Sequence, residues 1–156
     1  MKLAAGGFAA RAAGAERIMT RPIITLTTDF GHGSPYVAAM KGVILSINPE
    51  ATLVDITHGV PHQDVQQGAM ILANVTSSFP TGAIHVAVVD PGVGSSRPIV
   101  YAEIAGRRYL APDNGLLDRL ALLQAPSTIV ELADPAFWLP QVSATFHGRD
   151  ILAPVL

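Results

Sequence analysis

Runs of apolar residues alternate with amphipathic segments along most of the chain after its first twenty residues. The β-branched, apolar runs are typical of buried strands, and we expect strands over 23–30, 52–57 and 83–90. Between them, apolar residues recur every three or four positions, which predicts helices over 36–47 and about 63–78. The order strand, helix, strand, helix, strand favours a mainly parallel sheet with helices on both faces.

The pattern changes after residue 90. The elements expected there are a hairpin, a helix, a strand and a tail, over 98–112, 113–124, 128–133 and 143–156. The hairpin turns at Gly106, and Asp113 or Asn114 is the expected N-cap of the helix. Together these segments predict one Rossmann-like α/β domain over residues 21–156.

Composition supports a folded domain and excludes several functions. Apolar residues make up 49% of the chain and charged residues only 14%, so disorder is excluded as the main state. The net charge of −2 gives no electrostatic case for nucleic acid, and no apolar run approaches the roughly 18 residues of a membrane span. The absence of cysteine excludes disulfides and thiolate ligands and is compatible with the cytoplasm. So few charges suggest that a partner subunit or a further domain covers part of the surface.

The first twenty residues differ in composition from the rest. Lys2 followed by small apolar residues imitates a signal peptide, but Gly6 and Arg11 interrupt the apolar run. We therefore expect residues 1–20 to form a disordered or weakly helical extension, with Met19 as an alternative start.

Two carboxylates stand where parallel strands are expected to end. Asp29 closes the first strand and Asp90 the third, and a Gly-rich loop follows each. Ligands bind at this edge of open α/β sheets. Either aspartate alone could simply cap a turn, but two of them at one edge favour a binding site. Arg97 leaves the loop that Asp90 enters, so these two side chains can form a bidentate ion pair.

A histidine near the end of the chain is a third candidate. His147 lies beside Gly148 in the short polar segment 145–150. An imidazole can transfer protons near neutral pH, and a neighbouring glycine allows unusual backbone geometry. Most isolated histidines are structural, but this context favours a functional role.

A metal-dependent hydrolase using Asp55, His58 and His62 is an alternative. Two histidines four residues apart on a helix can share a metal ion. Gly59 and Pro61 lie between them, so the expected helix begins at or after Pro61 and this spacing is lost. The phosphate-loop, dinucleotide and nucleophile-elbow motifs do not occur in the chain. We therefore expect neither a metal ion nor a cofactor.

Six motifs, in order, carry a resemblance to a known family. They are TTDFG (27–31), YVAAMKG (36–42), VDITHGV (54–60), HVAVVDPGVGSSR (85–97), YLAPDNGLL (109–117) and TFHGRDILAP (145–154). The segment from about Pro22 to the last residue is similar to the S-adenosyl-L-methionine (SAM) hydroxide adenosyltransferases, which are relatives of the fluorinases and chlorinases.

The resemblance implies an enzyme that hydrolyses SAM to adenosine and L-methionine by hydroxide attack on the 5′ carbon of the ribose, with no cofactor. It implies that Asp90, Arg97 and His147 activate the hydroxide. The residues that it implies for substrate binding are Asp29, which would hold the ribose, and Phe30, Asp113, Asn114, Thr145 and Phe146. Halide-using relatives lack the same His–Gly pair, so the resemblance favours hydroxide over halide.

The resemblance also implies a homotrimer in the cytoplasm, with each active site between neighbouring subunits. Family members carry a second, C-terminal β domain of about a hundred residues, which helps to bind the substrate and is absent from these 156 residues. A catalytically impaired fragment that binds adenosine or SAM is therefore an alternative to an active hydrolase.

Overall fold

A computed structural model describes residues 21–156, and the extension expected over 1–20 lies outside them. These residues form a six-stranded sheet in the order β2-β1-β3-β5-β4-β6. The strands are β1 Ile23–Thr28, β2 Thr52–Thr57, β3 Ile84–Val88, β4 Ile99–Ile104, β5 Arg107–Pro112 and β6 Thr128–Glu131. The pairs β2–β1, β1–β3 and β3–β5 are parallel, whereas β4 is antiparallel to both β5 and β6. The mainly parallel sheet and the hairpin are therefore confirmed.

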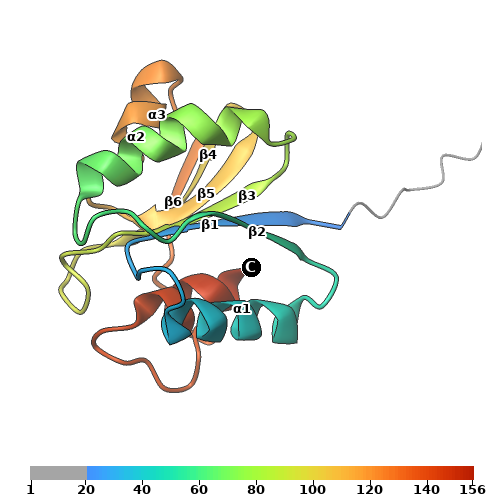
Figure 1. Cartoon of the computed structure of the whole chain (residues 1–156), viewed down its shortest axis with the longest axis vertical. Helices are drawn as coiled ribbons and strands as arrows, with labels where there is room; N and C mark the ends of the chain where they lie inside the picture. Colours follow the sequence, from blue (N-terminus) through green and yellow to red (C-terminus); the bar gives the residue numbers. More distant parts are fainter. Residues whose placement is uncertain (1–20) are drawn as a thin grey trace, which may run out of the picture.

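Helices cover both faces of the sheet, as the alternating pattern predicts. The α-helices are α1 Pro35–Ile47, α2 Val65–Val75 and α3 Asp118–Leu123. Helix α1 and the C-terminal segment lie on one face, and α2 and α3 lie on the other (Figure 1). The shorter helical turns are η1 Thr76–Ser78, η2 Pro135–Phe137, η3 Gly148–Leu152 and η4 Ala153–Val155. The fold is α/β with three layers.

Successive side chains of β3 and the residue after it pack alternately into two hydrophobic clusters, one on each face of the sheet. Val86 and Val88 pack in the cluster that also contains Met40 of α1. The intervening Ala87 and the following Val89 pack in the second cluster, beneath α2 and α3. Because successive side chains of a strand point to opposite faces, a continuous apolar run fills both layers, as expected for a central parallel strand.

The helix expected over 63–78 is shorter than predicted. It begins at Val65, because Gln63 has a positive φ of 61° that a helix cannot contain. Asp64 caps α2 by accepting a hydrogen bond from the backbone N–H of Gln67.

The prediction that Asp113 or Asn114 caps a helix over 113–124 is also wrong. Gly115 has a φ of 101°, which interrupts helical geometry, and α3 begins only at Asp118 without a side-chain cap. The side chain of Asn114 instead binds backbone groups of neighbouring segments. Within residues 21–156, no helix has the length and apolarity that crossing a membrane requires.

Candidate active site

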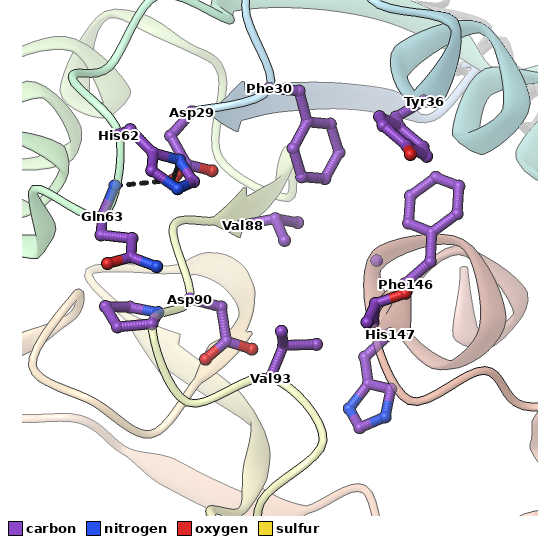
Figure 2. A pocket seen from close by; sticks show the side chains of 13 residues that line it. Asp29, Phe30, Tyr36, His62, Gln63, Val88, Asp90, Val93, Phe146 and His147 are labelled. Carbon is purple, nitrogen blue, oxygen red and sulfur yellow. Dashed lines mark hydrogen bonds and ion pairs between the residues drawn. The ribbon is translucent and has the colours of Figure 1, made fainter.

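A pocket of about 330 Å³ opens at the carboxyl ends of β1 and β3. Its lining residues are Asp29, Phe30, Tyr36, His62, Gln63, Val88, Asp90, Pro91, Val93, Thr145, Phe146, His147 and Gly148. Asp29 and His147 lie on opposite sides of it (Figure 2). The sheet edge predicted from the sequence to bind a ligand is therefore hollowed, and segments far apart in the chain line it.

Asp90 and Arg97 form the bidentate pair that their shared loop predicts. Arg97 Nε donates to Asp90 Oδ1 and Oδ2 at 2.9 and 2.8 Å, and Arg97 Nη2 also donates to Oδ2. Asp90 Oδ1 in addition accepts from the backbone N–H of Gly92, so the carboxylate caps its turn as well. The side chains are only 6% and 11% exposed for Asp90 and Arg97 respectively, so this ion pair is largely shielded from solvent.

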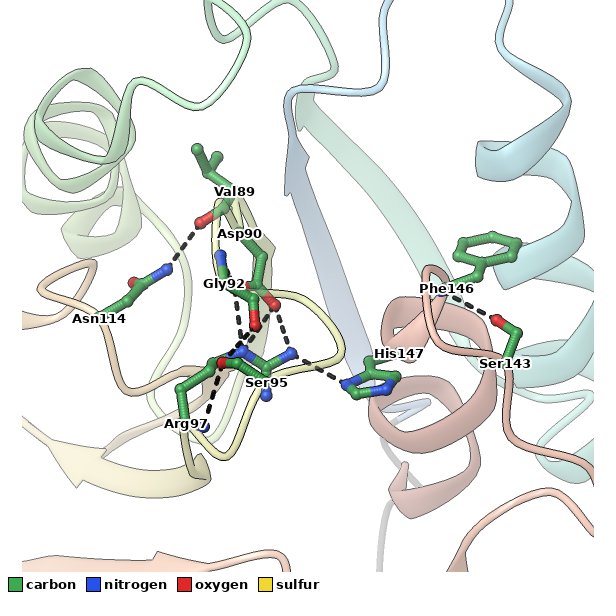
Figure 3. A network of polar contacts seen from close by, with 9 residues as sticks. All are labelled: Val89, Asp90, Gly92, Ser95, Arg97, Asn114, Ser143, Phe146 and His147. Carbon is green, nitrogen blue, oxygen red and sulfur yellow. Dashed lines mark hydrogen bonds and ion pairs between the residues drawn. The ribbon is translucent and has the colours of Figure 1, made fainter.

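His147 completes a row of three charged or titratable groups. Arg97 Nη2 lies 3.0 Å from His147 Nδ1, and the guanidinium stands between Asp90 and the imidazole (Figure 3). Because a guanidinium only donates, Nδ1 must accept, which places the proton of the neutral ring on Nε2. Burial and the positive charge of Arg97 lower the pKa of His147, so the neutral form is favoured at pH 7.

The loop that carries Asp90 touches the segment before His147. Gly94 has a φ of 80°, and a Cβ at this position would overlap the carbonyl oxygen of Ala144. Only glycine allows both this conformation and this approach. The contact helps to bring Arg97 and His147 together although they are fifty residues apart.

A π-helix, η3, begins directly after His147. The carboxylate of Asp150 in this helix is fully buried. It accepts hydrogen bonds from Ser143 N–H at 2.8 Å and from Arg149 Nε at 2.6 Å, while Ser143 Oγ accepts from Phe146 N–H. Single π-turns are frequent at functional sites, and this one fixes the backbone on both sides of the imidazole.

On the opposite wall, the carboxylate of Asp29 is held from another loop. Asp29 Oδ2 accepts a hydrogen bond of 2.8 Å from the backbone N–H of Gln63, and His62 Nδ1 lies 3.4 Å from the same oxygen. The side chain of Asp29 is 8% exposed. The positive φ of Gln63 costs on the order of 1 kcal/mol for a residue other than glycine, and it belongs to the loop that presents this N–H to the pocket carboxylate.

Three aromatic rings form the remaining wall. Phe146 meets Tyr36 and Phe30 edge-on, with ring centroids 5.0 and 5.8 Å apart. Tyr36 begins the helix predicted over 36–47 but was not predicted to line a pocket; its side chain is 56% exposed. A tyrosine at the first turn after a Gly-rich loop was the available signal.

The other residues predicted to bind substrate are placed differently. Thr145 is exposed and lines the pocket, as Phe30 and Phe146 do. Asp113 is exposed and Asn114 half-buried, and neither lines this pocket. Asn114 Nδ2 donates to the carbonyl oxygen of Val89 at 2.9 Å (Figure 3), which supports the backbone next to Asp90. The predicted binding roles of Asp113 and Asn114 remain predictions.

The geometry does not bring Asp55, His58 and His62 together as metal ligands. His58 Nε2 lies 3.1 Å from Asp55 Oδ1, whereas His62 contacts Asp29 across the pocket edge. Among residues 21–156, no group of three histidine, aspartate or glutamate side chains could hold a metal ion. The metal-site alternative is therefore wrong for these three residues. The physical reason is that Gly59 and Pro61 interrupt the helical spacing that would have brought the two histidines together.

Comparison with known proteins agrees with the motifs. Residues 24–156 match the family described as SAM hydroxide adenosyltransferase N-terminal domain. The chain belongs to this family. It is 44% identical over 135 residues to the (R)-S-adenosyl-L-methionine hydrolase of Salinispora arenicola, covering 86% of this chain and 51% of that protein. The corresponding hydrolase of Thermus thermophilus is 40% identical, with 86% and 54% covered.

More distant and structural relatives extend the comparison. The fluorinase of Nocardia brasiliensis is 30% identical, with 85% of this chain and 52% of that protein covered. A crystal structure of an uncharacterized conserved protein from Thermotoga maritima superposes with a TM-score of 0.82 at 38% identity, over 85% of this chain and 51% of that one. This member of the SAM hydroxide adenosyltransferase family thus spans about half the length of the relatives that it matches.

In this family member, the pocket combines three chemical capacities. Asp90 lines it as a carboxylate that can accept a proton, beside a fixed guanidinium. His147 contributes an Nε2–H donor while its Nδ1 is occupied. Asp29 offers an acceptor on the far wall, of the kind that binds sugar hydroxyls. A polar ligand with an apolar, planar part would suit the two acidic walls and the aromatic side chains.

Proposed function

We propose that this protein hydrolyses SAM to adenosine and L-methionine. The observation that carries the proposal is the position of Arg97, which does not itself line the pocket but binds at once two residues that do, Asp90 and His147. Family membership and the names of relatives such as the Salinispora arenicola hydrolase support the choice of substrate. These side chains suit the formation and alignment of a hydroxide nucleophile.

The proposed reaction is a single displacement at carbon. The oxygen of a water molecule forms a bond to the 5′ carbon of the ribose, and the bond from that carbon to the sulfonium sulfur breaks. Its electron pair passes to sulfur, which leaves as the neutral thioether of methionine. The water loses one proton, for which the carboxylate of Asp90 is the acceptor, and the other proton stays on the new hydroxyl of adenosine.

The difficult part of this reaction is the nucleophile. A sulfonium leaves as a neutral group, so no acid and no Lewis-acidic cofactor is needed to assist its departure. Water is a poor nucleophile at neutral pH, and the positive charge of the guanidinium that binds Asp90 and His147 favours the developing hydroxide. Asp90 takes the proton as general base, which typically contributes about 10²–10⁴-fold. His147 donates its Nε2–H to the water oxygen and aligns it for in-line attack.

The rest of the pocket would bind the nucleoside. Asp29 is positioned to accept hydrogen bonds from the ribose hydroxyls, since only one of its oxygens is used by Gln63. Phe30 and Phe146 offer apolar ring surface to the adenosyl group, and Thr145 a hydroxyl at the rim. Asp113 and Asn114 belong to the proposal as substrate-binding residues beyond this pocket.

The decisive assay mixes the purified chain with SAM and follows adenosine and methionine by chromatography. Release of both in equal amounts supports hydrolysis. Tight binding of SAM or adenosine without product would favour the second candidate, a catalytically impaired binding fragment, which is specifically motivated because the chain spans about half of its relatives. Activity that survives a chelator would agree with the metal-free scheme, and activity abolished by a chelator would contradict it.

The assembly and location are part of the same proposal. We infer a homotrimer in the cytoplasm, with each site completed by a neighbouring subunit. The exposed apolar side chains Leu122, Leu123 and Phe137 are 87%, 75% and 62% accessible, and subunit contacts would remove such surface from water. Light scattering coupled to size-exclusion chromatography measures the mass directly, and a monomer at micromolar concentration would contradict this assembly.

A further inference from the structure

A row of polar side chains lies behind the turn that carries Asp29 and has no part in the proposed chemistry. Lys41 Nζ donates to Asp55 Oδ2 at 2.6 Å, and Asp55 Oδ1 lies 3.1 Å from His58 Nε2. His58 Nδ1 is 2.9 Å from Thr28 Oγ1, which accepts a hydrogen bond of 3.3 Å from the backbone N–H of Phe30. The row therefore runs from the surface of α1 to a residue that lines the pocket.

With a neutral imidazole at His58, one arrangement of the protons satisfies this row. Partial burial would raise the pKa of Asp55, but hydrogen bonds and charge from Lys41 and His58 bring it below its ordinary value, so the carboxylate is ionised. It attracts the ring proton of His58 to Nε2, although this N–H is not well aligned with Asp55 Oδ1. Nδ1 must then accept from the hydroxyl of Thr28. The hydroxyl oxygen is left with lone pairs for the N–H of Phe30.

Burial makes this arrangement rigid. Thr28 is fully buried and His58 is 6% exposed, so neither can exchange its partner for bulk water. Two backbone hydrogen bonds also join the turn after β1 to the segment after β2. Gly31 N–H donates to His58 O at 2.8 Å, and Val60 N–H donates to Thr28 O at 3.3 Å. The row thus fixes the backbone of the pocket turn rather than a surface loop.

We propose that Thr28 and His58 are positioning residues that hold the Asp29–Phe30 turn in its binding geometry and thereby set the affinity for the adenosyl group. Neither residue touches the pocket, and both act through the backbone of Phe30. The inference rests on the proposed function, because it assigns the nucleoside part of SAM to this wall. Binding to the nucleoside is made in the ground state and in the transition state alike, so its loss raises KM more than it lowers kcat.

The same strand provides a matched control. Thr25, also on β1 and fully buried, bonds through its hydroxyl to Nδ1 of a second buried histidine, His85, at 2.7 Å. This pair has the same chemistry as Thr28 and His58 but lies three residues earlier in the strand, and neither member lines the pocket. Replacing it perturbs the buried sheet without touching the turn.

The experiment compares Thr28→Val, His58→Phe and their double variant with the conservative Thr28→Ser, and with Thr25→Val as control. We expect Thr28→Val to raise KM for SAM about tenfold, as loss of one buried hydrogen bond allows, with kcat within about threefold. Thr28→Ser should restore KM, and Thr25→Val should leave it unchanged. The double variant should be no worse than the single ones, because both break the same row.

Several results would overturn the inference. An unchanged KM in Thr28→Val, an equal rise in Thr25→Val, or a failure of Thr28→Ser to restore KM would each assign these residues a general structural role. If the unaltered chain releases no adenosine, the proposed function fails, and hydrogen exchange of the Phe30 amide decides the positioning role alone. Faster exchange in Thr28→Val than in Thr25→Val and Thr28→Ser would support it, and equal exchange would refute it.

Discussion

Replacing Arg97 by lysine tests the centre of the proposed mechanism, because the charge is kept and the geometry is lost. The guanidinium reaches both oxygens of Asp90 and Nδ1 of His147 at once. A single ammonium on a flexible stem cannot present this planar fork. We therefore expect Arg97→Lys to bind substrate almost normally but to align the nucleophilic water poorly.

The expected magnitude follows from the bonds that are lost. Lysine would forgo the contact with His147 and one of the bonds to Asp90, and each charge-assisted hydrogen bond contributes about 1.5–3 kcal/mol. The ammonium recovers part of this, so we expect kcat to fall by about 10²–10³, comparable to the loss of one donor from an oxyanion hole. The free energy of unfolding should fall by only about 1 kcal/mol, since Asp90 keeps a cation.

The assay is adenosine release at saturating and limiting SAM, with chemical denaturation in parallel. Arg119→Lys, an exposed position in α3, is the matched control for the substitution and should behave as the parent protein. The reasoning is refuted if Arg97→Lys keeps kcat within about threefold of the parent, or if KM rises by as much as kcat falls.

Three further predictions concern pH and loop geometry. Since burial and Arg97 lower the pKa of His147 below its ordinary 6.5, kcat should hold at pH 6.5 and decline only at lower pH, and His147→Gln should remove this acid limb from the residual rate. Burial lowers the pKa of His85 from 6.5 to about 4, so the unfolded state binds a proton more readily than the folded state. Thermal unfolding should therefore show a stability that is full above pH 6.5 and is lost progressively towards pH 4. The dependence of stability on pH should be flatter in His85→Phe. Gly94→Ala should lower activity more than tenfold by pushing the loop away from Ala144. Gly82 has a similar φ of 88°, but no atom lies within 4 Å of the added carbon, so Gly82→Ala should cost about 1 kcal/mol of stability and leave the rate unchanged. Equal rates in the two variants would contradict this.

Much of the architecture follows from local patterns in the sequence. Strand β3 is recognisable because its apolar run serves both cores, and the pairing of Asp90 with Arg97 follows from their shared loop. Both are short-range consequences of strand periodicity and turn chemistry. The confirmed fold class and the position of the pocket at the carboxyl edge rest on the same rules.

Other features depend on contacts that spacing cannot reveal. His147 meets Arg97 across fifty residues, and only the family resemblance pointed to that contact. The N–H of Gln63 reaches Asp29 from a loop in which this residue adopts a left-handed conformation, for which glutamine gives no signal. The late start of α3 also depends on such features, because Gly115 adopts a left-handed conformation and the side chain of Asn114 binds Val89 O instead of capping a helix.

The π-helix after His147 has a consequence for chain length. Each residue of an α-helix advances by about 100° around the axis. A π-turn contains one residue more than an α-helical turn, so it rotates the chain before the turn by about this angle relative to the chain after it. Deleting a single residue between Gly148 and Leu152 should remove the extra residue of the π-turn and turn the imidazole by about a quarter of a turn, away from the guanidinium. Insertions and deletions should therefore be far less tolerated in these five positions than amino-acid substitutions. The number of residues in this short helix, more than their identity, would then determine whether the site can form.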